Sequence, residues 1–279
     1  MIKSIQWLAI SIIGAVLFIY FGKAVHLSTT IVIDTPPSDR VVISAPIQLL
    51  MYGGDHFLAA NIETMRLATT ASTIEDGNGS SYLYRTHSLV AQLNPCHEDN
   101  YYFSTAFLTW GGSADKANEI LHLAGECRHW DWIPPFFYAF NQYYFNRNSD
   151  VAVKYLNLAA QRSADNHASL TKTAIMIKTG SINDDQMALA YLTNERDNAT
   201  DPNLRELLDK RVTRLLGLIT LRNAQQRFET ETGRLLKTTE ELIDTGYLQK
   251  IPNDPLKLGY SFINGRFEFR TLRIKGMEK

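Results

Sequence analysis

A repeated spacing of small and aliphatic residues constrains this chain more than any other feature of its sequence. Three segments share a motif of alanine, then leucine four positions later, then a third residue at offset seven, and they begin 35 and 36 residues apart. They comprise Ala117, Leu121 and Ala124; Ala152, Leu156 and Ala159; and Ala188, Leu192 and Glu195. These offsets place side chains on one helix face, and alanine there lets two helices approach closely. The pattern predicts an array of paired helices, with an irregular helical bundle as the alternative.

Residues 80–197 resemble the tetratricopeptide repeat (TPR) family, whose unit is a helix–turn–helix of about 34 residues. Each alanine segment follows an Asp or Asn near a turn and a second apolar, helix-compatible segment. The resemblance implies a protein that binds other proteins. The chain departs from the family pattern because Glu195 replaces the third alanine, the aromatic signature of the first helix is incomplete, and the boundary proline is missing after two units.

The amino-terminal segment from Ile5 to Gly22 contains no charged side chain. As a helix it would span roughly 27 Å, which is sufficient to cross the hydrocarbon core of a bilayer. A cleaved signal peptide would have a shorter apolar region and a small-x-small cleavage site, whereas this segment ends in Tyr20-Phe21-Gly22-Lys23. We expect an uncleaved transmembrane anchor, with a cleaved signal peptide and a buried helix as alternatives. Lysines on both sides leave its orientation undecided by charge.

Cys96 and Cys127 are the two cysteines of the chain. They lie at opposite ends of a predicted helical hairpin that turns at Gly111-Gly112, and the nearly equal helix lengths return both cysteines to the same level. This geometry permits a disulfide and favours an oxidising compartment such as the bacterial periplasm. Two unrelated buried thiols are the alternative.

The carboxyl-terminal residues change character after a long amphipathic helix predicted near Pro202–Thr232. Asn264-Gly265 between alternating apolar residues predicts a β-hairpin. This segment, with Pro252-Asn-Asp254-Pro255 before it, is similar to the tail of the major pseudopilins of type II secretion over some 45 residues. The likeness supports a pilin-like structural subunit as an alternative function, although residues 1–33 lack the acidic side chain expected of a prepilin.

Five regions follow from these patterns, in a fold that we expect to be mainly α-helical and TPR-like. They are a cytoplasmic stub and anchor at 1–24, an extended linker at 25–54, helical repeats at 55–200, a long capping helix at 201–236, and a carboxyl-terminal helix and β-hairpin at 237–279.

An aromatic segment from His129 to Phe145 is the best candidate for a binding surface. Residues four apart, namely Trp132, Phe136, Phe140 and Tyr144, should lie mostly in the core. The remaining face carries Trp130, Tyr138 and Asn141, and amphipathic aromatic residues of this kind dominate protein interfaces. We therefore expect these three residues to contact a protein partner, on a groove lined by the first helices of successive units.

The formal net charge of −1 indicates neither a nucleic-acid surface nor a polybasic lipid-binding patch. The sequence contains no recognised catalytic, phosphate-binding or metal-ligand spacing, and the acidic residues beside His56 and His97 are typical of helix caps. We expect no enzymatic activity, no cofactor and no metal. The sequence thus predicts a single-pass inner-membrane protein with a periplasmic array that binds other envelope proteins, in an assembly such as a pilus or secretion system.

Overall fold

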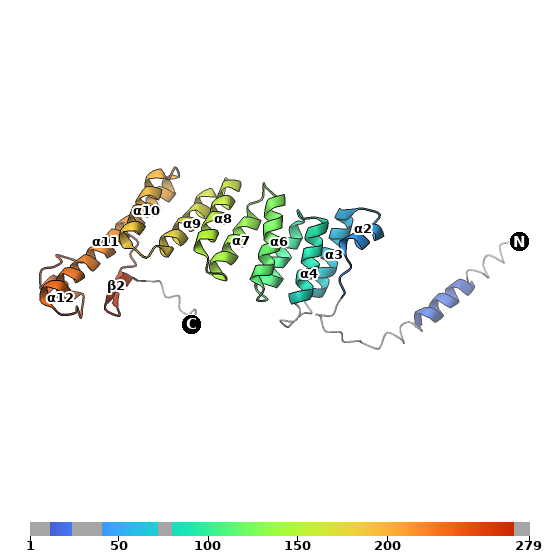
Figure 1. Cartoon of the computed structure of the whole chain (residues 1–279), viewed down its shortest axis with the longest axis horizontal. Helices are drawn as coiled ribbons and strands as arrows, with labels where there is room; N and C mark the ends of the chain where they lie inside the picture. Colours follow the sequence, from blue (N-terminus) through green and yellow to red (C-terminus); the bar gives the residue numbers. More distant parts are fainter. Residues whose placement is uncertain (1–11, 24–40, 72–79, 271–279) are drawn as a thin grey trace, which may run out of the picture.

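The computed structural model describes residues 12–23, 41–71 and 80–270, which are mainly helical with one antiparallel hairpin. The elements are α2 (Ala45–Met51), α3 (His56–Ala71), α4 (Ser80–Leu93), α5 (Glu98–Ser104), the π-helical η3 (Thr105–Thr109), α6 (Ala114–Cys127), α7 (Ile133–Tyr144), α8 (Ser149–Arg162), α9 (His167–Ser181), α10 (Asp185–Asn198), α11 (Pro202–Thr232), α12 (Glu240–Asp244), β1 (Tyr260–Ile263) and β2 (Arg266–Phe269). The helices follow one another along an elongated array, from α2 at one end to α12 at the other (Figure 1).

The alanine motif lies on alternate helices of this array, because α6, α8 and α10 begin at residues 114, 149 and 185. All five alanines and all three leucines of the motif are buried. Ala159 of α8 shares a core cluster with Ala139 of α7 and Ala174 of α9. The predicted helix pairs are therefore present, and small residues fill the contacts between them.

Glu195 occupies the third motif position on α10, where the two preceding units have alanine. Its side chain is half-buried, and burial raises the pKa of its carboxyl group above the usual value. Burial of the Tyr191 hydroxyl, together with the charge of Glu195, raises the pKa of Tyr191 to about 12. A position that is only half-buried tolerates a carboxylate, whereas the fully buried Ala124 and Ala159 do not have room for one.

Capping residues set the boundaries of the later helices. The side chains of Asn148, Asp184 and Asp201 each accept a hydrogen bond from the backbone N–H three residues ahead, at the starts of α8, α10 and α11. Such caps satisfy amide donors that have no partner within the helix. The Asp and Asn predicted near turns thus lie at the helix starts of α8 and α10, and Asp201 has the same role at α11.

The predicted extended linker at 25–54 is wrong at its carboxyl-terminal end, because Ala45–Met51 forms α2. Proline in the first turn of α2 needs no amide partner and is compatible with helix. Ala45, Leu49 and Tyr52 pack against α3 and α4, which supplies the tertiary contact that a seven-residue helix needs. Residues 25–40 lie outside the described residues.

Residues 12–23 form a helix whose side chains are all exposed. Within the three described ranges, no helix is both long enough and apolar enough to cross a membrane. The predicted anchor at residues 5–22 begins within residues 1–11, which are outside the described ranges, so the anchor stays a prediction.

The carboxyl-terminal end of the array is covered by the segment after α11. The predicted hairpin is confirmed, with Tyr260 opposite Phe269 and a turn at Asn264-Gly265 in which both residues have positive φ. Leu242 of α12 and Phe267 of β2 are buried in one cluster with the apolar face of α11. This segment closes the last helix as a terminal cap does in a repeat array.

A buried ion pair holds the covering segment to α11. Arg214 Nε of α11 donates to Asp254 Oδ2 over 3.0 Å, and both side chains are almost fully buried. Burial alone would raise the pKa of Asp254, but N–H donors from Leu256 and Gly259 and the Arg214 charge outweigh it, so the pKa lies below its usual value. Nη2 of Arg214 donates to the carbonyl oxygens of Gly259 and Arg270 in the hairpin region.

Gly217 lies one helical turn from Arg214, at a position where the covering segment packs closely against α11. A β-carbon at this position would overlap the Tyr260 hydroxyl and lie 2.8 Å from Cζ of the same ring and 3.1 Å from Pro252 Cβ. The hydroxyl of Tyr260 donates to the Arg214 carbonyl oxygen over 3.0 Å. Only glycine leaves room for this contact.

Replacement Gly217→Ala should therefore destabilise the protein by about 1–3 kcal/mol, because the covering segment must move to avoid overpacking. Thermal unfolding and limited proteolysis after residue 232 would measure the loss of stability and the release of the segment. Gly180→Ala is the matched control, since a β-carbon on this helical glycine meets no atom within 4 Å. The control should be neutral or stabilise by up to about 1 kcal/mol, and equal destabilisation by both replacements would contradict the role of Gly217.

The depressed pKa of Asp254 predicts an acid-sensitive cap. A group with a lower pKa in the native state stabilises the fold above its unfolded-state pKa, here 3.8, and this contribution is lost as the pH falls through the native value. The free energy of unfolding of the wild type should therefore decrease when the pH is lowered past about 4. Asp254→Asn should be about 3–5 kcal/mol less stable at neutral pH, because Arg214 is left buried without its partner, and should show a shallower acid dependence. Parallel curves for the two proteins would contradict this account.

Candidate functional site

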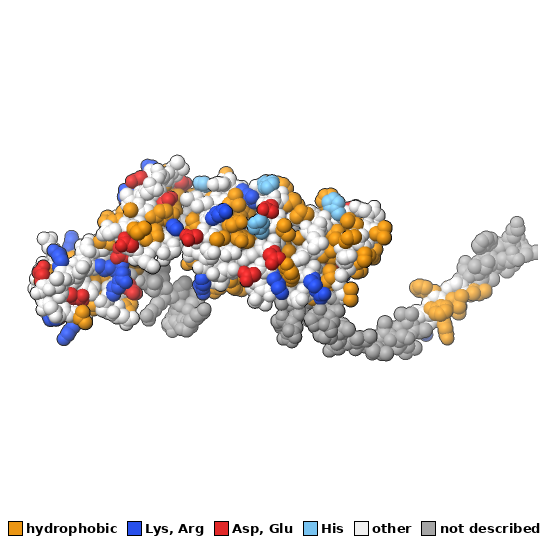
Figure 2. Space-filling model, in the orientation of Figure 1, with side chains coloured by type: hydrophobic (Ala, Val, Ile, Leu, Met, Phe, Trp, Pro, Cys, Tyr) orange, Lys and Arg blue, Asp and Glu red, His pale blue; other side chains and the backbone are white. Residues whose placement is uncertain are grey.

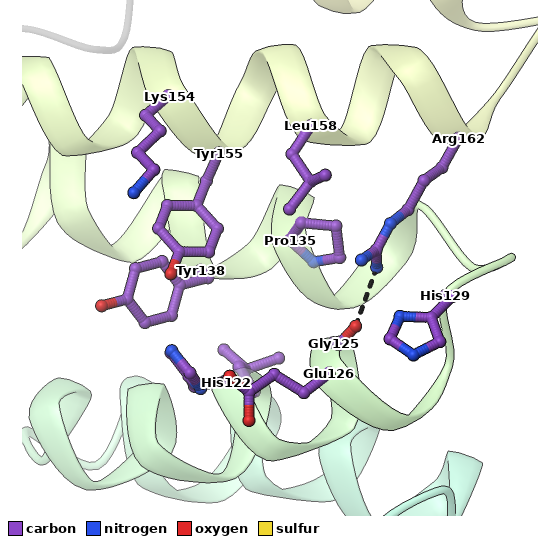
Figure 3. A pocket seen from close by; sticks show the side chains of 11 residues that line it. His122, Gly125, Glu126, His129, Pro135, Tyr138, Lys154, Tyr155, Leu158 and Arg162 are labelled. Atoms are coloured by element: carbon purple, nitrogen blue, oxygen red, sulfur yellow. Dashed lines mark hydrogen bonds and ion pairs between the residues drawn. The ribbon is translucent and has the colours of Figure 1, made fainter.

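A cleft between α6 and α8, with α7 as its floor, is the best candidate site of the array (Figure 3). Its volume is about 340 Å³. The lining residues are Leu121, His122, Gly125 and Glu126 of α6, His129, Pro135 and Tyr138 of α7 and the turn before it, and Lys154, Tyr155, Leu158 and Arg162 of α8. We call this the α6–α8 cleft.

Two tyrosines in ring contact form the aromatic part of the α6–α8 cleft. The ring centroids of Tyr138 and Tyr155 are 4.3 Å apart, and the two ring planes are tilted by 36°. Burial, and then the neighbouring Tyr138 and Glu126, raise the pKa of the Tyr155 hydroxyl, which is therefore neutral and able to donate a hydrogen bond at physiological pH. The pair presents an apolar surface with two polar tips, a combination common in binding sites.

Exposed ionisable side chains surround the tyrosine pair. The ammonium group of Lys154 lies 5.8 Å from the centroid of the Tyr155 ring. His122 Nδ1 lies 3.5 Å from Glu126 Oε1, and its ring lies 6.2 Å from that of Tyr138. The opening of the cleft therefore carries both signs of charge over an aromatic floor.

Arg162 closes the other end of the α6–α8 cleft and has a structural role there. Its Nη1 donates to the carbonyl oxygens of Gly125, Arg128 and Asp131 at 3.0, 3.3 and 3.1 Å. Burial lowers the pKa of this guanidinium, and the nearby charge of Asp131 opposes the shift. A cation on the last carbonyls of α6 satisfies acceptors that the helix leaves open, so this charge is already engaged within the protein.

The three predicted partner-binding residues do not form one surface. Tyr138 lines the α6–α8 cleft, as expected for a binding residue. Trp130 is 66% exposed beside Arg128, but it does not line the cleft.

The prediction that Asn141 faces a partner is wrong, because its side chain is fully buried. Its Nδ2 donates to Thr109 Oγ1 at 3.1 Å and to Asn118 Oδ1 at 2.9 Å. Asn141 therefore joins α7 to η3 and α6 within the core. The side chain was expected on the face opposite the aromatic stripe, but α7 is covered on several sides and the Asn141 amide nitrogen donates within the core.

The aromatic stripe predicted for the core lies on the opposite side of α7 and is only partly buried. Trp132, Phe136 and Phe140 are half-buried, whereas Tyr144 is 45% exposed, so the core prediction is wrong for Tyr144. Phe136, Phe140 and Tyr144 line a second groove with residues of α8 and α9, with a volume of about 350 Å³. The aromatic content of α7 thus serves two surfaces separated by a buried face.

Sequence reasoning missed the contribution of α8 to the α6–α8 cleft. The alanine motif drew attention to the buried side of this helix. Tyr155, Leu158 and Arg162 follow one another at offsets of three and seven, which form a second stripe on the other side. That spacing was a usable signal.

A disulfide joins Cys96 and Cys127, as predicted from the matched helix lengths, with a Cα–Cα distance of 5.3 Å. Arg128 follows Cys127 and donates to the Cys96 carbonyl oxygen, to Glu98 and to Asp131. Asp131 also accepts hydrogen bonds from the Tyr101 hydroxyl and the Ile133 amide. The disulfide and this network fix the turn between α6 and α7, and with it the position of Tyr138.

The histidines considered as metal ligands have other partners. His56 Nδ1 lies 2.9 Å from the Leu93 carbonyl oxygen, and His97 Nε2 lies 2.9 Å from Asn61 Oδ1. Asp55 accepts a hydrogen bond from the Leu58 amide, as a helix cap does. Among the residues that the structure describes, no three His, Cys, Asp or Glu side chains are grouped so as to hold a metal ion.

No protein-family model, curated protein or solved structure shows significant similarity to this chain.

Removal of the disulfide should lower stability without removing the helices. The double replacement Cys96→Ser with Cys127→Ser opens a loop of 31 residues and should cost about 2–4 kcal/mol. Chemical denaturation with and without reductant would test this. Reductant should bring the wild type down to the stability of the double variant and leave the variant unchanged, and identical stability of the two oxidised proteins would show that the bond contributes nothing.

Proposed function

We propose that this chain is a membrane-anchored periplasmic scaffold whose TPR-like helical array binds proteins of an envelope assembly through the α6–α8 cleft. The observation that carries this proposal is the open cleft in which Tyr138 of α7 and Tyr155 of α8 lie in ring contact. Tyrosine side chains lose little conformational entropy on binding and bury a large area, which suits protein recognition.

The chemistry of the cleft favours binding of a peptide segment. An apolar or aromatic side chain would fit against the two tyrosines, while Lys154 and the exposed pair of His122 and Glu126 could contact polar groups of the same segment. A helix array offers such clefts between neighbouring helices of a rigid frame. The proposed partner is therefore a protein segment with an exposed apolar anchor.

Location follows from two independent features. The uncharged sequence from residue 5 to residue 22 supports an uncleaved anchor in the inner membrane. The bond between Cys96 and Cys127 supports an oxidising compartment, since structural disulfides are rare in reducing cytosol. Together they favour a single-pass protein with its array in the periplasm, near pilus or secretion machinery if the tail resemblance reflects its context.

Capture of partners from gently solubilised membranes would test the proposal. Tyr138→Ala and Tyr155→Ala should each weaken capture of a specific partner by more than about 1 kcal/mol, which is roughly five-fold in affinity. Tyr144→Ala is the matched control, because this tyrosine belongs to the same helix as Tyr138 but lines the opposite groove. Quantitative mass spectrometry of the captured proteins would provide the readout, with circular dichroism to establish that each variant is folded.

Equal losses for all three variants, or no loss at Tyr138 and Tyr155, would contradict the assignment of the cleft. Asn141→Ala serves as a separate check. Because Asn141 is a buried tie between helices, this change should lower stability by about 1–3 kcal/mol and affect capture only through folding.

A further inference from the structure

The two ends of the helical array differ in how their apolar surfaces are covered. At the carboxyl-terminal end, α12 and the hairpin bury the apolar face of α11. At the other end, α2 and α3 present large apolar side chains without cover from any described residue, and Figure 2 shows hydrophobic side chains gathered over this end. A repeat array normally ends in a unit with a polar outer face, so an open apolar end requires an explanation.

The exposed residues form the outer sides of two neighbouring helices. They are Ile47, Leu50 and Met51 of α2 and Phe57, Ile62 and Met65 of α3, each between 40% and 83% exposed. We call them the α2–α3 face. The opposite sides of the same helices, which include Leu49, Ala59 and Ala60, pack toward α4.

Helix α3 is thus apolar on both sides, although only one side is covered. A helix with this distribution is typical of the interior of a protein or of an interface. Monomeric proteins rarely leave contiguous apolar surface of this kind in water. The α2–α3 face therefore has the composition of a surface that becomes buried.

Charge decides which occupant suits this face. From residue 41 to residue 65, Asp55 and Glu63 are the two acidic residues, and neither Lys nor Arg occurs. Glu63 is buried and paired with Arg66, whereas Asp55 is exposed and accepts a hydrogen bond from the Leu58 amide. Attraction to an anionic lipid surface would need basic residues here, and a charged partner would find little to pair with. A second uncharged apolar face is the best complement.

We propose that the α2–α3 face binds the same face of a second copy of this chain, forming a two-fold symmetric dimer. The six side chains that define the α2–α3 face are uncharged, and a two-fold interface uses one patch twice, so this face complements itself. The proposed anchor favours the same occupant, because it would hold both copies in one bilayer and raise their local concentration. This last step rests on the proposed membrane location, whereas the composition of the face does not.

Photo-cross-linking in the native membrane tests the identity of the occupant directly. With p-benzoylphenylalanine in place of Leu50, which is 83% exposed, irradiation should yield an adduct of about twice the 31.6 kDa chain that contains peptides of this protein alone. The same probe at Leu235, which is 76% exposed near the opposite end, should not yield it. An adduct with another protein, or no adduct of double mass, would overturn the proposal.

A pair of replacements that introduces negative charge provides the second test, on full-length protein that has been purified in mild detergent. Leu50→Glu with Met65→Glu should weaken self-association at least 100-fold in analytical ultracentrifugation. Leu235→Glu with Met187→Glu is the matched control, because these residues have similar exposure elsewhere and should leave association unchanged. If association survived the replacements at Leu50 and Met65, the contact between copies would lie elsewhere. Equal loss of association in both variants would likewise contradict the proposed interface. Carbonate extraction tests the anchor separately. Release of the protein by carbonate would contradict the membrane location but would leave the dimer prediction standing.

Discussion

Close contact between helices through alanine is the constraint on which the rest of this structure depends. Ala117, Ala152 and Ala188 have no more than 5% exposure, and each lies where one helix meets its neighbours. Since a helix in such an array contacts mainly the helices before and after it, the described residues form several core clusters that follow one another along the chain. Larger side chains are then displaced to the flanks of each contact, where they line clefts.

The ends of the array follow from the same constraint, because the first and last helices have a neighbour on one side only. At α11 the unmet face is covered by a segment of the same chain, and a cluster around Phe228 and Phe267 supplies the apolar contacts. Apolar burial alone is not directional. The ion pair of Arg214 with Asp254 and the close contact of Tyr260 with Gly217 add directional constraints on where the hairpin packs. At α3 no described segment supplies such a cover.

Periodic features could be predicted from the sequence, whereas features that depend on surroundings could not. The helix pairs follow from the alanine spacing, the bond between Cys96 and Cys127 from equal helix lengths, and the hairpin from Asn264-Gly265. Each of these is a local pattern with a fixed geometric consequence.

The candidate site was only partly predictable, for a physical reason. Helix α7 has neighbours on more than one side, and a sequence of aromatic residues does not reveal which side faces another helix. Tyr138 lines a cleft, and its binding role stays a prediction, whereas Asn141 is buried. Tyr155 was overlooked because the alanine motif of α8 dominates the sequence of that helix. The helix α2 was missed because seven residues carry too little periodic signal, and its stability comes from packing on α3 and α4.

The α6–α8 cleft is held open by interactions outside its aromatic floor. Arg162 ties α8 to the last carbonyls of α6, and the disulfide with Arg128 fixes the turn that leads into α7. Asn141 holds α7 to η3 and α6 from inside the core. Three helices fixed in this way hold Tyr138 and Tyr155 in ring contact. In the function we propose, a partner that filled the cleft would not have to order it, and more of the contact energy would be available for affinity and for choice between partners.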